Sequence, residues 1–253
     1  MSDICPICEG SGLRVIDQAD GTRAAAECPC RVSRRGVRQF EAARIPERYR
    51  DCTLDNFVTN LEGHSHSLQA ALIEARGFLR SHAWTLDGDG LLITGRVGVG
   101  KTHLAVGVLQ ALINERGVKG LFVHYRDLLK QVQNSYNRSA EATEREILRP
   151  IMEAEVLVLD ELGAARPTEW VADTVEHILN TRYNDCRTTI ITTNLVNAPP
   201  AATTYGATAA AARADTLGDR IGERMRSRLQ EMCVVVEMQG EDFRQKVKRA
   251  SFA

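Results

Sequence analysis

The stretch Gly95-Arg-Val-Gly-Val-Gly-Lys101-Thr102 decides how this chain folds. It fits the pattern G-x-x-x-x-G-K-[ST], whose glycines let backbone N–H groups close around phosphate oxygens at the positive end of a helix. An apolar run, residues 90–94, precedes it, and an amphipathic segment, residues 101–115, follows it. A strand, a loop and a helix in this order predict a nucleotide site. The residues expected to bind the nucleotide are Gly95, Val97, Gly98, Val99, Gly100, Lys101, Thr102 and His103.

An acidic pair follows a second apolar run. Residues 156–159 read Val-Leu-Val-Leu, and Asp160 and Glu161 come next. Lys101 would bring a charge to the β- and γ-phosphates, while the Thr102 hydroxyl and Asp160 would hold Mg²⁺. Glu161 is suited to polarise an attacking water. We therefore expect ATP and Mg²⁺ as cofactors and ATP hydrolysis as the reaction.

A third strand ends in polar residues, Thr192-Thr193-Asn194. A side chain at the C-terminal edge of a strand beside the acidic pair would face the γ-phosphate. Asn194 is therefore a candidate for orienting the attacking water, although asparagine after a strand is also a common turn residue.

Apolar runs alternate with helical patterns along the chain. Strands are expected at residues 90–94, 120–125, 156–160, 188–193 and 233–237. Helices are expected at residues 32–43, 67–82, 101–115, 126–136, 144–152 and 168–183, with Pro150 interrupting the end of the fifth. This alternation predicts an α/β fold in which a doubly wound, five-stranded parallel sheet is covered on both faces. The alanine-rich stretch at residues 197–215 is expected to be a loop.

Composition excludes two classes of protein. Hydrophobic residues make up 43% and charged residues 26% of the 253 residues, which is typical of a globular chain and not of a disordered one. No apolar run is long enough to cross a membrane, and the first residues lack the basic and apolar regions of a signal peptide. We expect a cytoplasmic protein. The net charge of −1 conceals a basic stretch from Arg23 to Arg50, which suggests a partner surface or a solvated helix.

Four of the seven cysteines lie within the first 30 residues. Cys5 and Cys8 form one close pair, and Cys28 and Cys30 form another. Two pairs of thiolates joined by a loop suit tetrahedral Zn²⁺, whereas four free thiols in a tail are the alternative. We expect a small zinc-binding module with a basic helix at residues 1–45 and a second domain at residues 46–253.

The order of loop, acidic pair and Thr-Thr-Asn strand resembles an AAA+ ATPase of the P-loop (ASCE) class. Five phrases more narrowly resemble the DnaC/DnaI helicase-loader family, with IstB-type transposition helpers as close kin. They are Ile45-Pro-Glu-Arg-Tyr49, Asp160-Glu-Leu-Gly163, Asn180-Thr-Arg-Tyr183, Gly222-Glu-Arg-Met-Arg-Ser-Arg-Leu229 and Gly240-Glu-Asp-Phe-Arg244. The resemblance covers residues 45–249. It implies that Arg228 is the arginine finger that reaches a neighbouring subunit, with Arg224 as a second candidate. It also implies that Arg244 is a sensor-II arginine acting within its own subunit.

The same resemblance implies three partners. These are a replicative DNA helicase of the DnaB-type hexamer, held by the zinc module; single-stranded DNA; and further copies of the chain, joined through the arginine finger. DNA contacts are expected from Arg126, Lys130 and Arg138, although each can equally be an ordinary surface charge. Two other functions stay open: an ATPase helper of a DNA transposase, and a zinc-dependent adaptor that binds nucleotide without significant turnover.

Overall fold

Five apolar runs form one parallel sheet in the computed structural model, which describes residues 4–17, 21–59, 66–81, 87–136, 142–165, 168–200 and 215–246. The strand order is β4-β5-β6-β3-β7, and all neighbouring strands are parallel. The strands are β3 (Gly90–Gly95), β4 (Gly120–His124), β5 (Val156–Asp160), β6 (Thr188–Thr193) and β7 (Cys233–Met238). The predicted α/β fold with a five-stranded parallel sheet is confirmed, and β5 and β6 have the predicted ends.

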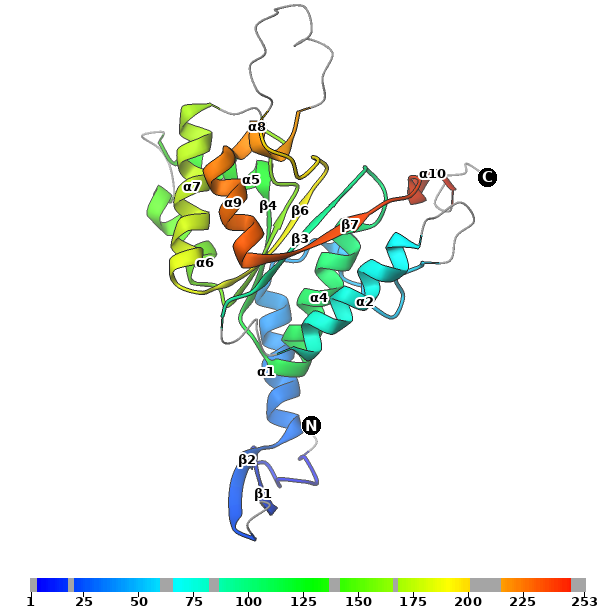
Figure 1. Ribbon diagram of the computed structural model, residues 1–253. Coiled ribbons are helices and arrows are strands. Elements are labelled where there is room, and N and C mark those ends of the chain that lie inside the picture. Colours follow the sequence, from blue (N-terminus) through cyan, green and yellow to red (C-terminus); the bar gives the residue numbers. More distant parts are fainter. Residues whose placement is uncertain are drawn as a thin grey trace, which may run out of the picture.

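Helices cover both faces of the sheet, so that the domain has three layers (Figure 1). Alternate residues of one strand enter different cores: Leu91 and Ile93 pack with the helices of one face, and Leu92 packs with those of the other. The first face carries α1 (Pro29–Ala42), α2 (Ser67–Arg80) and α4 (Lys101–Arg116). The second carries α5 (Tyr125–Ser135), α6 (Glu144–Glu153), α7 (Glu169–Asn184), α8 (Leu217–Ile221) and α9 (Glu223–Met232).

The strand order brings the predicted polar residues to one edge of the sheet. β6 lies between β5 and β3, so the phosphate loop after β3 and the acidic pair after β5 flank the end of β6. In β4, His124 lies in register with Asp160. Because the strands are parallel, all of these C-terminal ends meet at the same edge, which is where ligands bind in open α/β sheets.

An antiparallel hairpin of β1 (Leu13–Asp17) and β2 (Arg23–Glu27) precedes α1. The sequence analysis did not predict these strands. All five residues of β1 are exposed, and β2 is mostly alanine, so neither shows the alternation of apolar and polar residues that marks a half-buried strand.

α1 connects the hairpin to the sheet domain (Figure 1). It begins at Pro29, three residues before the expected start at Val32, because proline is favourable in the first turn of a helix, where its missing N–H is not needed. Near its middle, Gly36 lies against α4: a Cβ there would come within 3.3 Å of the Ile113 carbonyl oxygen. After its end, the Ala43 carbonyl accepts a 2.7 Å hydrogen bond from the Phe122 N–H in β4. The domain boundary at residue 45 stays a prediction.

The expected interruption of α6 at Pro150 was wrong. α6 continues through Pro150 to Glu153, and the Pro150 carbonyl accepts a hydrogen bond from the Ala154 N–H. Proline removes only one donor, and the capping box at Thr143 and Glu146 satisfies backbone donors at the start of this short helix. In the alanine-rich stretch, residues 201–214 lie outside the described residues. No described helix is both long enough and apolar enough to cross a membrane.

Candidate active site and candidate metal centre

The phosphate loop bends tightly between β3 and α4. Gly98 and Gly100 have φ angles of 81° and 101°, which side chains other than glycine rarely allow. A Cβ at Gly98 would lie 2.0 Å from Oδ1 of Asp242, so the C-terminal segment packs directly on the loop. The Phe243 N–H donates a 3.1 Å hydrogen bond to the Gly98 carbonyl, which ties α10 (Phe243–Lys246) to this site.

Lys101 lies under the loop with its ammonium group bonded to backbone oxygens. Nζ donates to the carbonyls of Gly95 at 2.8 Å and Arg96 at 2.7 Å. Burial lowers the pKa of Lys101 to about 8, against the opposing effects of Asp160 and Glu161, and the charge of Arg244 lowers it further. An anion in the loop would offer Nζ a stronger partner than two neutral carbonyls.

Asp160 is buried at the end of β5 and accepts two hydroxyl hydrogen bonds on one oxygen. Thr102 Oγ1 donates to Oδ1 at 2.9 Å, and Thr192 Oγ1 donates to the same atom at 2.7 Å. Burial raises the pKa of this carboxyl group, and the two hydroxyls act in the opposite direction. A buried carboxylate beside a threonine hydroxyl is a donor set of hard oxygens that fits Mg²⁺. Thr102 and Asp160 are the residues that would hold it.

Glu161 follows in a strained backbone conformation. Its φ is 62°, and its N–H donates to Thr192 Oγ1 at 3.0 Å. Its Oε2 lies 3.3 Å from Nε2 of His124, whose Nδ1 lies 3.6 Å from Oδ2 of Asp127. A non-glycine residue in the left-handed region costs free energy that the surroundings must supply, and Thr192 and His124 are the groups that fix Glu161 here.

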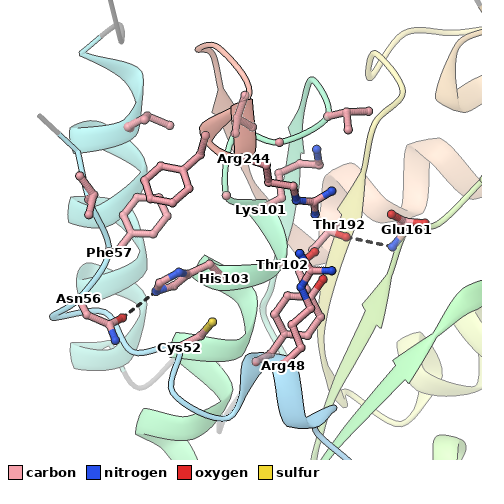
Figure 2. Close-up of a pocket in the computed structure, with 18 of the residues that line it drawn as sticks. Arg48, Cys52, Asn56, Phe57, Lys101, Thr102, His103, Glu161, Thr192 and Arg244 are labelled. Carbon is pink, nitrogen blue, oxygen red and sulfur yellow. Dashed lines mark hydrogen bonds between the residues drawn. The ribbon is translucent and has the colours of Figure 1, made fainter. Parts of the chain in front are cut away.

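A cavity of about 390 Å³ lies beside these groups. Figure 2 shows Lys101, Thr102, Thr192, Glu161 and Arg244 around it. The predicted residues that line it are Val97, Gly98, Val99, Gly100, Lys101, Thr102, His103, Glu161, Asn194 and Arg244. Gly95 and Asp160 do not line it, but the first bonds Lys101 and the second bonds Thr102.

His103 faces the cavity and holds the chain segment that forms one wall. Its Nε2 lies 3.0 Å from the Thr53 carbonyl oxygen and 2.8 Å from Oδ1 of Asn56 (Figure 2). The ring of Phe57 meets the imidazole edge to face, with centroids 5.3 Å apart. His103 therefore positions residues 53–57, which the sequence analysis did not assign to the site.

The predicted arginine finger does not line the cavity of its own chain. Arg228 lies on α9, where it donates a hydrogen bond to Asn180 Oδ1 and lies over the ring of Tyr183 at 5.7 Å. Arg224, the second candidate, lies 3.6 Å from Glu176. Both therefore face α7. An arginine finger acts on a neighbouring subunit, so this position leaves the prediction untested.

Two of the three predicted DNA contacts, Arg126 and Lys130, lie about one turn apart on α5. Arg126 is exposed, and its guanidinium donates a 2.7 Å hydrogen bond to the Ala164 carbonyl, close to the acidic pair in sequence. Lys130 is exposed on α5. Arg138 lies outside the described residues.

The four N-terminal cysteines come together at the base of the hairpin. Their sulfur atoms all lie within 4.8 Å of one another. Cys8 Sγ lies 3.4 Å from Cys30 Sγ, and Cys5 Sγ lies 3.8 Å from Cys28 Sγ. Four sulfurs around zinc at about 2.3 Å stand about 3.8 Å apart in a tetrahedron, so the donor set fits Zn²⁺.

The backbone around Cys5 and Cys8 lowers the pKa of both thiols and so favours the thiolate form that zinc requires. Burial opposes ionisation of Cys8, but N–H groups of Gly12 and Gly10 and the thiol of Cys30 outweigh it and lower the pKa of Cys8 to about 6. The neighbouring Cys8, followed by burial, raises the pKa of Cys30 to about 12. The positive charge of a divalent cation would offset the repulsion between neighbouring thiolates, so that all four cysteines could be deprotonated together.

Comparison with known proteins agrees with a nucleotide site at this edge of the sheet. The sequence matches the family of IstB-like ATP binding proteins over residues 24–251. The replicative helicase loader DnaC of Escherichia coli K12 is 24% identical over 159 residues, which cover 62% of this chain and 61% of that protein. The replicative helicase loader DnaI of Bacillus subtilis is 33% identical over 98 residues, which cover 39% of this chain and 30% of that protein. The matches therefore span less than two thirds of either relative.

Solved structures show the same fold. A crystal structure of the DnaC helicase loader aligns with a TM-score of 0.60 at 29% identity, covering 76% of this chain and 99% of that one. A crystal structure of DnaI aligns with a TM-score of 0.59 at 21% identity, covering 77% and 95%. The AAA+ P-loop fold is thus confirmed. The chain belongs to the family of IstB-like ATP-binding proteins and is homologous to the DnaC and DnaI helicase loaders.

Proposed function

We propose that this protein binds and hydrolyses ATP with Mg²⁺ and uses the cycle to load a replicative DNA helicase. One observation carries the ATPase proposal: the phosphate-loop lysine, Glu161 and Arg244 meet around a single cavity at the C-terminal edge of the sheet, and Asp160 is bonded to Thr102 of its lining. A protein that only binds nucleotide has no need of a glutamate fixed beside the phosphate loop.

Each residue has a role that follows from its position. Lys101 and the loop amides bind the β- and γ-phosphates, while Thr102 and Asp160 hold Mg²⁺, which neutralises charge on the phosphates when bound. Glu161 accepts a proton from the attacking water, and Asn194 orients that water. Arg244 stabilises negative charge on the phosphates within the same subunit.

Hydrolysis depends on assembly in this proposal. Arg228 lies outside the cavity of its own chain and completes the site of a neighbouring copy, where a guanidinium stabilises the charge of the transition state. Single-stranded DNA is held by Arg126 and Lys130, with Arg138, through phosphate contacts that read no sequence. When Arg126 binds a DNA phosphate, it gives up its hydrogen bond to the Ala164 carbonyl. The loop that follows Glu161 then loses this support, so DNA binding would affect the acidic pair.

The zinc-binding module engages the helicase. It carries exposed apolar side chains that a partner could cover, including Ile7, which is 58% exposed, and Val15, which is 69% exposed. The relatives named as replicative helicase loaders support this partner, which we infer to be a hexamer of the DnaB type.

A second candidate function has its own support. The family matched over residues 24–251 is that of IstB-like proteins, which favours an ATPase helper of a DNA transposase as the alternative. Both functions use the same ATPase site and differ in the partner. Pull-down of the full chain with a hexameric helicase and, separately, with a transposase in ATP separates them: retention of the transposase alone would exclude the loader proposal.

The hydrolytic assignment is tested by Glu161→Gln. We expect steady-state ATP turnover to fall by about 100-fold or more, since the amide cannot accept the proton, while the Kd for MgATP stays within about twofold. Glu153→Gln, at the exposed last residue of α6, is the matched control and should turn over as the wild type. Unchanged turnover in Glu161→Gln would leave the nucleotide-switched adaptor as the better description.

A further inference from the structure

The cavity has a third cation, supplied by a segment that lies outside the phosphate loop and the acidic pair. Arg48 belongs to the short helix η1 (Glu47–Tyr49), which follows α1 and Pro46. Its side chain lines the cavity together with Lys101 and Arg244. Figure 2 shows the Arg48 side chain rising from η1 into the cavity, on the side of Thr102.

The backbone that carries Arg48 is fixed to α4, the helix that begins at the phosphate loop. Gln110 of α4 donates from Nε2 to the carbonyls of Tyr49 at 3.2 Å and Arg50 at 2.8 Å. The turn closes on itself through a 2.8 Å hydrogen bond from the Tyr49 N–H to the Pro46 carbonyl. Arg48 therefore projects from a rigid support rather than from a free loop.

The charge of Arg48 has no acidic partner in the part of the chain that the structure describes. No carboxylate among the described residues lies within ion-pair distance of it, and its recorded contact is with the ring of Tyr49, 5.8 Å from Cζ. Arg50, two residues later, differs because its Nε lies 2.9 Å from Oε2 of Glu47. An unpaired guanidinium directed into a concave site has a strong preference for an anion.

The balance of charge in the cavity points the same way. Its lining residues include three basic side chains, Arg48, Lys101 and Arg244, against two carboxylates, Asp51 and Glu161. Glu161 already faces His124 at 3.3 Å. The phosphates of a nucleotide are the ligand chemistry that satisfies three convergent cations.

We propose that Arg48 binds phosphate oxygens of the nucleotide directly, from the segment that joins the zinc-binding module to the ATPase domain. This rests on the proposed ATPase function and adds a residue to it that neither the phosphate-loop motif nor the acidic pair contains. Arg48 acts within its own chain, whereas Arg228 is proposed to act on a neighbour. η1 begins shortly after α1 ends. A phosphate bound by Arg48 would therefore also stabilise the position of the C-terminal end of α1.

The test compares nucleotide affinity across matched variants of the full chain. Arg48→Ala and Arg48→Gln remove the charge, Arg48→Lys keeps it without the planar guanidinium, Arg50→Ala is the control at a paired arginine, and Lys101→Ala is the control for the phosphate loop. The Kd for MgATP is measured by isothermal titration calorimetry, together with the melting temperature without nucleotide. We expect Arg48→Ala and Arg48→Gln to raise the Kd about tenfold, Arg48→Lys to recover part of that loss, and Arg50→Ala to stay within about twofold.

Several results would overturn the proposal. Affinity of Arg48→Ala and Arg48→Gln within about twofold of the wild type would do so, as would equal affinity of Arg48→Gln and Arg48→Lys, because the charge would then be irrelevant. The exposed Arg48 side chain predicts unchanged melting temperatures without nucleotide, so a weakened Kd cannot be ascribed to unfolding. If Lys101→Ala lost MgATP binding while the Arg48 variants kept the wild-type Kd, this inference alone would be wrong. If the wild type did not bind MgATP at all, the proposed function would be wrong as well.

Discussion

At the scale of single residues, the site depends on contacts that hold Glu161 in place. The residue has a positive φ, its N–H is bonded to Thr192, and its carboxylate faces His124. His124 ends β4, on the far side of β5 from the phosphate loop, and Asp127 lies near its other nitrogen. The orientation of the proposed base is therefore set by a residue that does not line the cavity.

His124→Ala tests this role. We expect kcat to fall by about tenfold, because the carboxylate loses the group that orients it, while the Kd for MgATP stays within about twofold. Steady-state turnover and calorimetric binding give the two values. Asp127→Asn, at an exposed carboxylate 3.6 Å from the other ring nitrogen, is the control and should have a smaller effect. A wild-type kcat in His124→Ala would show that Thr192 alone suffices.

Lys101 predicts a dependence on pH. Burial lowers its pKa from 10.5 to about 8 in the folded chain, so the unfolded chain binds more protons between these values, and the nucleotide-free protein gains stability as the pH rises through this window. Phosphates favour the protonated ammonium, so nucleotide binding should take up part of a proton near pH 8.5 and weaken as the pH rises further. Calorimetry in two buffers of different ionisation enthalpy measures the uptake. Lys101→Arg keeps a cation that stays protonated throughout this window, so it should abolish the uptake, and identical heats for the wild type in both buffers would contradict the assignment.

The sequence predicts only part of the site, for a physical reason. Lys101, Thr102, Asp160 and Glu161 are found because a phosphate loop and a strand-end acidic pair are written in consecutive residues. Arg48 and His124 reach the site only through the folding of distant segments. Thr192 lies in a predicted strand, but the hydrogen bond from its hydroxyl to Asp160 depends on β5 and β6 being neighbours, which the sequence does not reveal.

At the scale of elements, a buried arginine joins two helices to the sheet. Arg182 on α7 is 0% exposed, and no carboxylate among the described residues forms an ion pair with it. Its guanidinium donates to the carbonyls of Ile151 at 2.8 Å, Ala154 at 2.9 Å and Thr188 at 2.5 Å, and Nε donates to Thr189 Oγ1 at 2.9 Å. One side chain thus satisfies carbonyls at the end of α6 and at the start of β6. Burial lowers its pKa to about 9.

Arg182→Met tests this junction. Removing the guanidinium leaves several buried carbonyls without a donor, so we expect the free energy of unfolding to fall by about 3 kcal/mol. Urea denaturation followed by circular dichroism measures the change. Arg145→Met, at an exposed position on α6, should stay within about 0.5 kcal/mol of the wild type. Equal stabilities of the two variants would show that methionine packing compensates for the lost hydrogen bonds.

Strands that are buried on both faces were predicted well. β5 and β6 have continuous burial and the predicted ends, because the apolar run of β5 and the β-branched threonines and isoleucines of β6 suit central parallel strands. β1 and β2 were not predicted, because exposed strands stabilised by neighbouring cysteines leave no apolar pattern in the sequence. Arg182 lies on a predicted helix, but its burial depends on α6 and β6, which no local pattern reveals.

At the scale of the whole molecule, the hairpin with its four cysteines and the sheet domain have separate sources of stability. The hairpin buries few apolar side chains and gathers four thiols, whereas the sheet domain has two extensive cores. Metal should therefore decide whether the hairpin folds and leave the sheet domain intact.

Cys28→Ser tests this separation. We expect the variant to lose most of its bound zinc and its hairpin to be cleaved rapidly by trypsin, while its Kd for MgATP stays within about twofold. Zinc is measured by mass spectrometry of the metal on the purified protein. Cys186→Ser, at an exposed cysteine outside the cluster, should retain one zinc per chain. Full zinc occupancy in Cys28→Ser, or loss of MgATP binding along with zinc, would contradict separate stabilities.

The attachment of the module by α1 has a consequence for an assembly of several copies. α1 is not a flexible linker, because Gly36 lies against α4 and the Ala43 carbonyl is bonded to β4. Copies joined through their ATPase domains would therefore present their zinc-binding modules at fixed spacing and in one direction. A ring-shaped partner with repeated sites could engage several modules at once, and weak individual contacts would combine into high avidity. Disassembly of the ATPase domains would then be enough to free the partner, without any change in the affinity of a single module.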